Sequence, residues 1–170
     1  MLNHTVILQK LGIFGVGVTM KKGMEILFDY TLYPAALLYL GFVWGGLIMT
    51  ISAIVLNVVT IKVYDWSKTD WLLIETLKSA RDNPDVQLPG ILGRLQFLLH
   101  YGDVAAFFVI SMFDDPVDTV LYLRKGSHEY NGLSSRDWWI FVGANLLANI
   151  SWILQLSIVI ASIKALFLDW

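Results

Sequence analysis

Two long runs without a charged residue dominate the pattern of hydrophobic and polar positions along the chain. The first covers residues 31–61 and the second covers residues 138–163. As one helix the first run would be about 46 Å long, whereas the hydrocarbon core of a bilayer is about 30 Å thick. It is too long for one perpendicular crossing and too short for two, so it predicts one tilted transmembrane helix near 32–61. The second run predicts another near 138–163.

A third and more polar segment lies between these two runs. Residues 95–113 are long enough to cross a bilayer, although their uncharged part covers only 104–113. A core helix of a soluble protein is the competing interpretation. Because the flanking runs already favour the bilayer, we predict a crossing here. The chain is then a single polytopic membrane domain over residues 1–170, with three spans and its two ends on opposite sides.

The remaining segments predict helices at the membrane surface. Lys10 interrupts the apolar run before residue 31, which favours an interfacial amphipathic segment over a cleaved signal peptide. The loop at 62–94 has apolar residues at helical spacing and predicts one short amphipathic helix. In the loop at 114–137, Asp115-Pro116 is typical of a helix start with a carboxylate cap. Ser134 or Ser135, followed by Asp137, predicts the cap of the last helix.

Composition agrees with a membrane protein and excludes several classes of function. Of the 170 residues, 56% are hydrophobic and only 15% are charged, against about 25% charged in a typical soluble domain. The net charge of −2 gives no basic field for nucleic acid, so no nucleic-acid partner is expected. The absence of cysteine excludes disulfides and thiolate chemistry. We expect an integral, multi-pass protein of a bacterial inner membrane, although Lys and Arg divide six against six and leave its orientation open.

A polar stripe runs along the predicted middle helix. Successive side chains at 100° place Gln96, His100, Asp103 and Ser111 on one face. This face would be costly toward lipid, so it should meet protein or water. Two interpretations stay open, an interhelical polar clamp and a pathway for an ion, proton or substrate.

Two further sets of residues predict contacts between helices. The last predicted span carries amides at Asn145, Asn149 and Gln155, which we expect to face the middle stripe and hydrogen-bond there. In the first span, Gly41 and Gly45 form a GxxxG pattern, extended by Gly46, that allows close helix packing. Three thin spans bury little surface among themselves, which favours a homo-oligomer.

No motif assigns a reaction, a metal or a cofactor. The acidic residues Asp114, Asp115 and Asp118 gather at a predicted membrane end, where carboxylates can attract a cation, but the helix cap is the preferred interpretation. An enzyme is the least expected class, because no nucleophile–base arrangement is visible. Two functions remain: a small homo-oligomeric channel or transport-type protein, and a non-catalytic accessory or immunity-type protein that binds a membrane protein partner.

Overall fold

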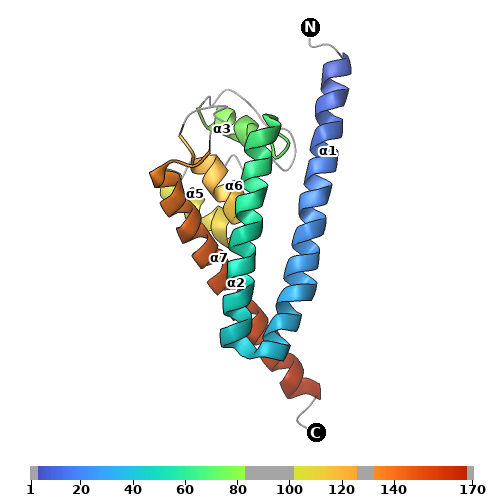
Figure 1. The fold of residues 1–170 in the computed structure, drawn as a ribbon, viewed down its shortest axis with the longest axis vertical. Coiled ribbons are helices and arrows are strands. Elements are labelled where there is room, and N and C mark those ends of the chain that lie inside the picture. Colours follow the sequence, from blue (N-terminus) through green and yellow to red (C-terminus); the bar gives the residue numbers. More distant parts are fainter. Residues whose placement is uncertain (1–3, 83–101, 126–131, 168–170) are drawn as a thin grey trace.

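The computed structural model describes residues 4–82, 102–125 and 132–167, and the elements that it assigns among them are all helical. In chain order they are α1 (His4–Leu27), the π-helical turn η1 (Phe28–Leu32), α2 (Tyr33–Ser67), α3 (Ile74–Asp82), α5 (Gly102–Phe113), α6 (Pro116–Leu123) and α7 (Ser135–Phe167). The predicted all-helical class is confirmed for this part of the chain. The long helices are α1, α2 and α7. In Figure 1, α3 and α6 lie near the end where α2 finishes, called the upper end below.

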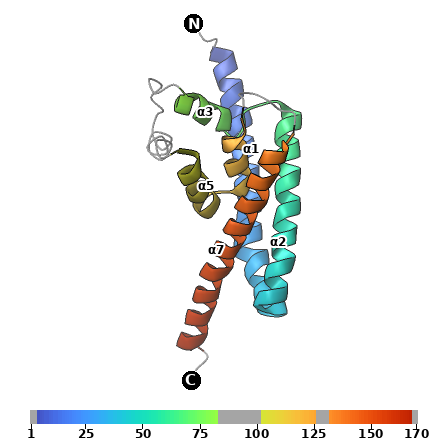
Figure 2. The ribbon, with the colours of Figure 1, turned by 90° about the vertical axis from the view of Figure 1, so that its left-hand side faces the viewer.

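Helix α2 turns back on itself at Gly41. This glycine has φ 78° and ψ 168°, outside the helical region and in a conformation that residues with a Cβ rarely adopt. Residues 33–40 continue the course of α1 and η1, and residues 42–67 return toward the upper end (Figures 1 and 2). We call residues 4–40 the descending limb and residues 42–67 the ascending limb. The prediction of one tilted helix over 31–61 is therefore wrong, because one glycine reverses the chain within that run.

The N-terminal segment belongs to this hairpin and forms no separate interfacial helix. It is helical from His4 to Leu27 and passes through η1 into α2 without a break, despite glycines at 12, 15 and 17. A Cβ added at Gly17 would lie 2.6 Å from a ring carbon of Trp71. The missing side chain therefore lets α1 approach the segment that follows α2.

Two helices, and not the predicted three, are long and apolar enough to cross a membrane among the described residues. They are Gly17–Ser67, which contains the hairpin, and Ser135–Ile163. The predicted middle span is represented by α5, whose 12 residues extend about 18 Å and fall short of a bilayer core. Residues 95–101 of that prediction lie outside the described residues.

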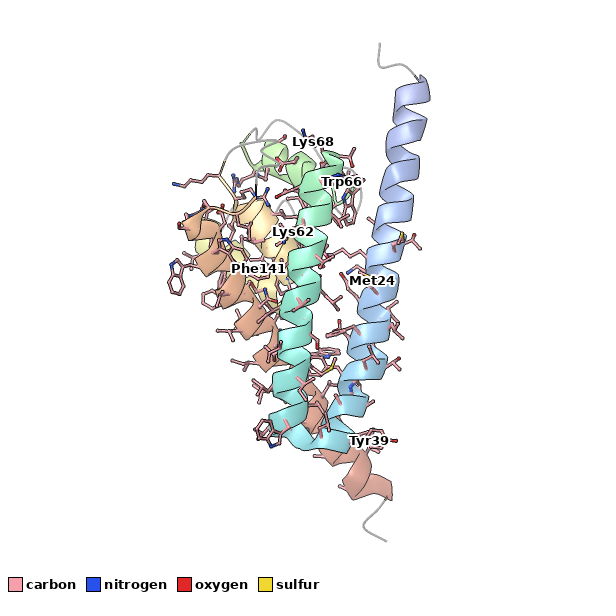
Figure 3. The ribbon with its side chains drawn as sticks, viewed as in Figure 1. Met24, Tyr39, Lys62, Trp66, Lys68 and Phe141 are labelled. Carbon is pink, nitrogen blue, oxygen red and sulfur yellow. The ribbon has the colours of Figure 1, made fainter. Side chains whose placement is uncertain are left out.

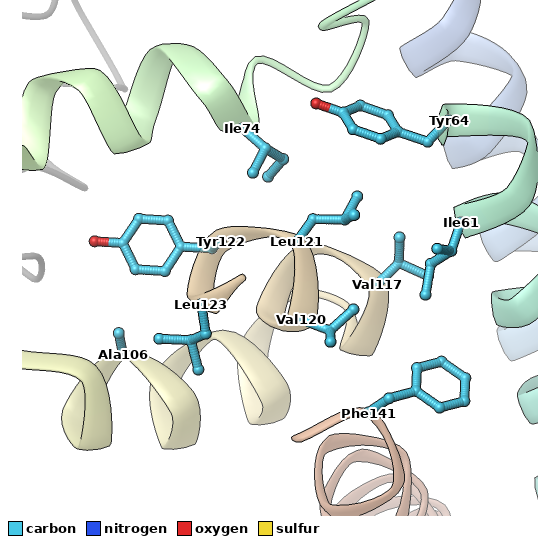
Figure 4. Close-up of a cluster of buried hydrophobic side chains, with 10 residues drawn as sticks. All are labelled: Ile61, Tyr64, Ile74, Ala106, Val117, Val120, Leu121, Tyr122, Leu123 and Phe141. Atoms are coloured by element: carbon cyan, nitrogen blue, oxygen red, sulfur yellow. The ribbon is translucent and has the colours of Figure 1, made fainter. Parts of the chain in front are cut away.

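The short helices build the hydrophobic core at the upper end. All eight residues of α6 are buried. Figure 4 shows its side chains among residues of α2, α3, α5 and α7. The cluster comprises Ile61, Tyr64, Ile74, Ala106, Val117, Val120, Leu121, Tyr122, Leu123 and Phe141. Helix α6 therefore holds the ascending limb, α3, α5 and α7 in one arrangement.

The local signals for helix starts are confirmed. Asp115 accepts a hydrogen bond from the Val117 N–H at 2.6 Å, with Pro116 at the first position of α6. Ser134 Oγ accepts from the Asp137 N–H at 3.3 Å, and the Asp137 carboxylate accepts in return from the Ser134 N–H at 3.0 Å. These reciprocal bonds form a capping box at the start of α7. The predicted amphipathic helix in the first loop is α3.

Candidate functional site

A cavity of about 160 Å³ lies between the hairpin, the junction of α5 and α6, and α7. We call it the polar cavity, because charged and amide side chains line much of it. On the descending limb these are Lys21, Glu25 and Asp29, which are spaced four residues apart and so share one helix face. The other polar or ionisable side chains that line it are Tyr33, Asn57, Thr60, Ser111, Asp114, Asp115, Asn149, Trp152 and Gln155.

Lys21 is the buried cation at the upper end of the polar cavity. Its Nζ lies 2.6 Å from Asp118 Oδ2, 3.1 Å from Glu25 Oε1 and 3.4 Å from Asp115 Oδ2. Lys21 is only 7% exposed, and both aspartates are 8% exposed. One ammonium thus faces three carboxylates. Asp118 Oδ1 is buried and has no hydrogen-bond partner among the described residues.

Burial beside a surplus of carboxylates changes the pKa of Asp115 and Asp118 at the start of α6. Burial raises the pKa of Asp118 from its ordinary value of 3.8 to about 7, while Lys21 opposes the rise and the charge of Asp115 adds to it. Burial also raises the pKa of Asp115, again against the attraction of Lys21, and a hydrogen bond with the Glu25 carboxyl adds to the rise. Asp115 and Asp118 therefore hold a proton more strongly than an aspartate in water does.

Below this charged group, amides of α7 hydrogen-bond to both limbs of the hairpin. Asn57 Nδ2 on the ascending limb donates to Asn145 Oδ1 at 2.8 Å. The Tyr33 hydroxyl on the descending limb donates to Asn149 Oδ1 at 3.0 Å. Both α7 amides are buried, and each also donates to a backbone carbonyl four residues earlier. These bonds fix α7 against the hairpin, which is a different partner from the middle stripe expected from the sequence.

The residues of the predicted middle stripe are separated in the structure. Gln96 and His100 lie outside the described residues. Asp103 is 60% exposed at the start of α5, between Arg81 at 3.6 Å and Arg136 at 3.9 Å, and it does not line the polar cavity. Ser111, by contrast, is buried, lines the cavity and shares a 3.2 Å hydrogen bond with Thr119.

The predicted amide residues of the last span, Asn145, Asn149 and Gln155, all lie on α7. Asn149 and Gln155 line the polar cavity, while Asn145 is fully buried beside it. Gln155 is exposed and donates to Ser151 Oγ at 3.2 Å. The predicted pathway along these amides stays a prediction.

The three glycines of the GxxxG pattern lie at and beside the hairpin turn. Gly41 makes the turn itself. A Cβ added at Gly45 would lie 2.5 Å from the backbone oxygen of Ala36 on the other limb. A Cβ added at Gly46 would lie 3.0 Å from Cδ1 of Ile153 on α7. The pattern therefore serves close packing within one chain at this place.

Sequence reasoning missed Lys21, Glu25 and Asp29. The available signal was their four-residue spacing, which places them on one face of a helix. Lys10 favoured an interfacial segment here, which directed attention away from this face. Asp118 belonged to an acidic cluster interpreted as a possible cation site or, preferably, a helix start, and its ion pair with Lys21 joins residues 97 positions apart.

The lining of the polar cavity is rich in carboxylates, a side-chain type that can bind protons and cations. It offers four carboxylates and one ammonium between apolar helices, with amides at its lower part. Among the described residues, no group of three or more His, Cys, Asp or Glu side chains is arranged to hold a metal ion. Comparisons with protein families, with curated proteins and with solved structures find no match to this chain.

Proposed function

We propose that this chain is a multi-pass membrane protein of the channel or transport type, in which the polar cavity passes a small monovalent cation or a proton. The observation that carries the proposal is a carboxylate-rich cavity enclosed by apolar helices. The homo-oligomer and the bacterial inner membrane expected from the sequence belong to the same proposal.

The outward faces of the long helices support a lipid environment. In the most apolar window of the hairpin only 22% of residues are buried within the protein, and in that of α7 only 6%. The core helix of a soluble protein would bury most of such a window, because exposed apolar surface of this extent is unfavourable in water. Lipid removes that cost.

Aromatic side chains mark two levels that fit a bilayer. Figure 3 shows Tyr39 at the hairpin turn and Trp66 near the upper end. Tyr39 is 89% exposed and Trp66 is 84% exposed, and Trp44, three residues beyond Gly41, is also exposed. The 22 residue steps from Trp44 to Trp66 rise about 33 Å as a helix, close to the thickness of a bilayer core. Aromatic belts occupy these levels in membrane proteins.

The charge of the polar cavity supports a cation over an anion. Its lining holds one lysine against Glu25, Asp29, Asp114 and Asp115, which gives −3 when all are ionised. In surroundings of low dielectric, such a surplus attracts a cation and repels an anion more strongly than it would in water. Lys21, the buried cation at the upper end of the polar cavity, is already paired with carboxylates.

The test is flux in liposomes that contain the purified protein. One sample encloses a pH-sensitive dye and another encloses a K⁺-sensitive dye. Asp115→Asn keeps a side chain that caps α6 and removes a charge from the cavity, so it should lower cation flux by tenfold or more. The matched control is Asp103→Asn, which removes an exposed carboxylate outside the cavity and should leave flux unchanged.

Three results are informative. Flux that depends on Asp115 but not on Asp103 supports the proposal. Flux that depends on Asp103 alone would mean that the pathway follows the polar stripe predicted from the sequence and not the polar cavity. A parent protein that passes neither cation overturns the proposal and favours the accessory or immunity-type alternative.

A further inference from the structure

Asp29 is a carboxylate without a partner deep in the polar cavity. It lies in η1, one turn beyond Glu25 on the same helix face, and lines the cavity at half burial. It has no hydrogen bond or ion pair with any residue that the structure describes. The π-helical turn around it is a rare conformation that occurs frequently at functional sites. A lone carboxylate of this kind calls for an explanation.

Asp29 lies nearer to the hairpin turn at Gly41 than Lys21 does. Twelve residues separate Asp29 from the turn at Gly41, a rise of about 18 Å. The same count for Lys21 is twenty residues, or about 30 Å. If the turn marks the lower face of the bilayer core, Asp29 is near its centre and Lys21 is at its upper face. An ionisable group at that depth is a functional candidate in membrane proteins.

Acidic groups outnumber basic ones among the charges that act on Asp29. Glu25, one turn earlier, and Asp115 at the start of α6 act on it with negative charge, and Lys22 is the one cation that does so among the described residues. Lys22 is itself held by Glu25 at 2.7 Å and is half exposed. The side chains that α7 contributes to the cavity are uncharged; they are Asn149, Trp152 and Gln155. The ascending limb contributes Asn57 and Thr60, which are also uncharged.

Trp152 supplies a second unpartnered group on the same cavity. Its ring packs edge-on against Tyr30, the residue next to Asp29, with ring centroids 5.5 Å apart. Its Nε1 is buried and has no hydrogen-bond partner among the described residues. An indole N–H can only donate, so the residues that line this cavity include one donor and one carboxyl that have no partner among the described residues.

We propose that the cation passed by the polar cavity is a proton, and that Asp29 is the deep group that binds and releases it. The inference rests on the proposed function and names its substrate. In the loaded state Asp29 is a neutral carboxyl. On release its O–H bond breaks, the proton passes through water or directly to the carboxylate of Glu25, one turn earlier on the same helix face, or to that of Asp115 at the start of α6, and Asp29 is left as a carboxylate.

The experiment combines chemical labelling with flux. Dicyclohexylcarbodiimide is an apolar reagent that adds to protonated carboxyls in apolar surroundings, and peptide mass spectrometry locates the adduct. In the parent protein in liposomes, Asp29 should be the main labelled carboxyl, and labelling should be at least fivefold faster at pH 6 than at pH 9. Labelling should abolish proton flux. Asp29→Asn, which keeps the shape of the side chain, should lower proton flux at least tenfold, whereas Asp103→Asn should retain it.

The outcomes separate this inference from the proposed function. Absence of an adduct at Asp29, or an Asp29→Asn variant with parental proton flux, overturns the role of Asp29 even where flux still depends on Asp115. A parent that passes K⁺ but no protons overturns the choice of substrate alone. A parent that passes neither cation overturns the proposed function, and an adduct at Asp29 then reports only a buried protonated carboxyl. A thermal unfolding midpoint of Asp29→Asn within a few degrees of the parent value shows that a flux loss is not caused by unfolding.

Discussion

Lys21→Met tests the central electrostatic feature of the structure, a single buried ammonium among three carboxylates. Methionine keeps most of the apolar stem and removes the charge. The Lys21 ammonium lies within 3.4 Å of a carboxylate oxygen on each of Asp118, Glu25 and Asp115. Removing one partner of a buried ion pair costs about 3–5 kcal/mol, because the remaining charges stay buried without compensation. Since most proteins are stable by only 5–15 kcal/mol, this is a large share of the free energy of unfolding.

The assay is thermal unfolding in mild detergent, followed by circular dichroism at pH 8 and at pH 5. At pH 8 the carboxylates are ionised, and the unfolding midpoint should fall by roughly 6–20 °C at 2–4 °C per kcal/mol. At pH 5 the loss should shrink, because the carboxyls of Asp115 and Asp118 bind protons when the ammonium is absent. The matched control is Lys22→Met. Lys22 pairs with Glu25 at 2.7 Å and Asp114 at 3.7 Å but is 53% exposed, so its removal should cost less than about 1 kcal/mol.

Equal midpoints for the two variants would refute this reasoning. They would mean that water reaches Lys21 as freely as it reaches Lys22. A loss at Lys21 that is the same at pH 5 and pH 8 would instead assign the effect to packing of the side chain, with no contribution from the carboxylates.

The remaining predictions concern the turn, the pH dependence and the amide contacts. Gly45→Ala should lower the free energy of unfolding by about 1–3 kcal/mol, because its Cβ would lie 2.5 Å from the backbone of the other limb. Gly46→Ala should cost less, because its Cβ meets the movable end of the Ile153 side chain. Chemical denaturation compares the two variants, and equal losses would contradict the turn geometry. Asp118 has a pKa of about 7 in the folded protein, above its ordinary 3.8, so the folded protein binds a proton that the unfolded chain releases. The free energy of unfolding should therefore fall as pH rises from about 4 to 7 and then level off. Asp118→Asn should flatten this slope. A double-mutant cycle at Asn57 and Asn145 should give a coupling of about 0.6 kcal/mol, and a value near zero would mean that the bond does not form in the membrane-like environment.

Local features of the chain could be predicted because they depend on neighbours in the sequence. Asp115-Pro116 and the Ser134–Asp137 pair begin helices as expected, since a cap needs only a side-chain oxygen within three residues of the free N–H groups. The apolar runs at 31–61 and 138–163 indicated helices with lipid-facing surfaces for the same reason. Apolar side chains favour any surroundings that exclude water, and this preference is the same whether protein or lipid covers them.

The three-dimensional arrangement decided everything that joins distant residues. Apolar composition across 31–61 is identical for a straight helix and for a hairpin, and the choice depends on one positive φ at Gly41 and on whether Gly45 can approach Ala36. The polar cavity likewise depends on packing. Lys21 meets Asp118 across 97 residues only because the hairpin brings α1 against α6. Helical periodicity places Lys21, Glu25 and Asp29 on one face, but it does not specify which helix that face will meet. The contact with that helix determines which of the three charges are paired and which stay unpaired.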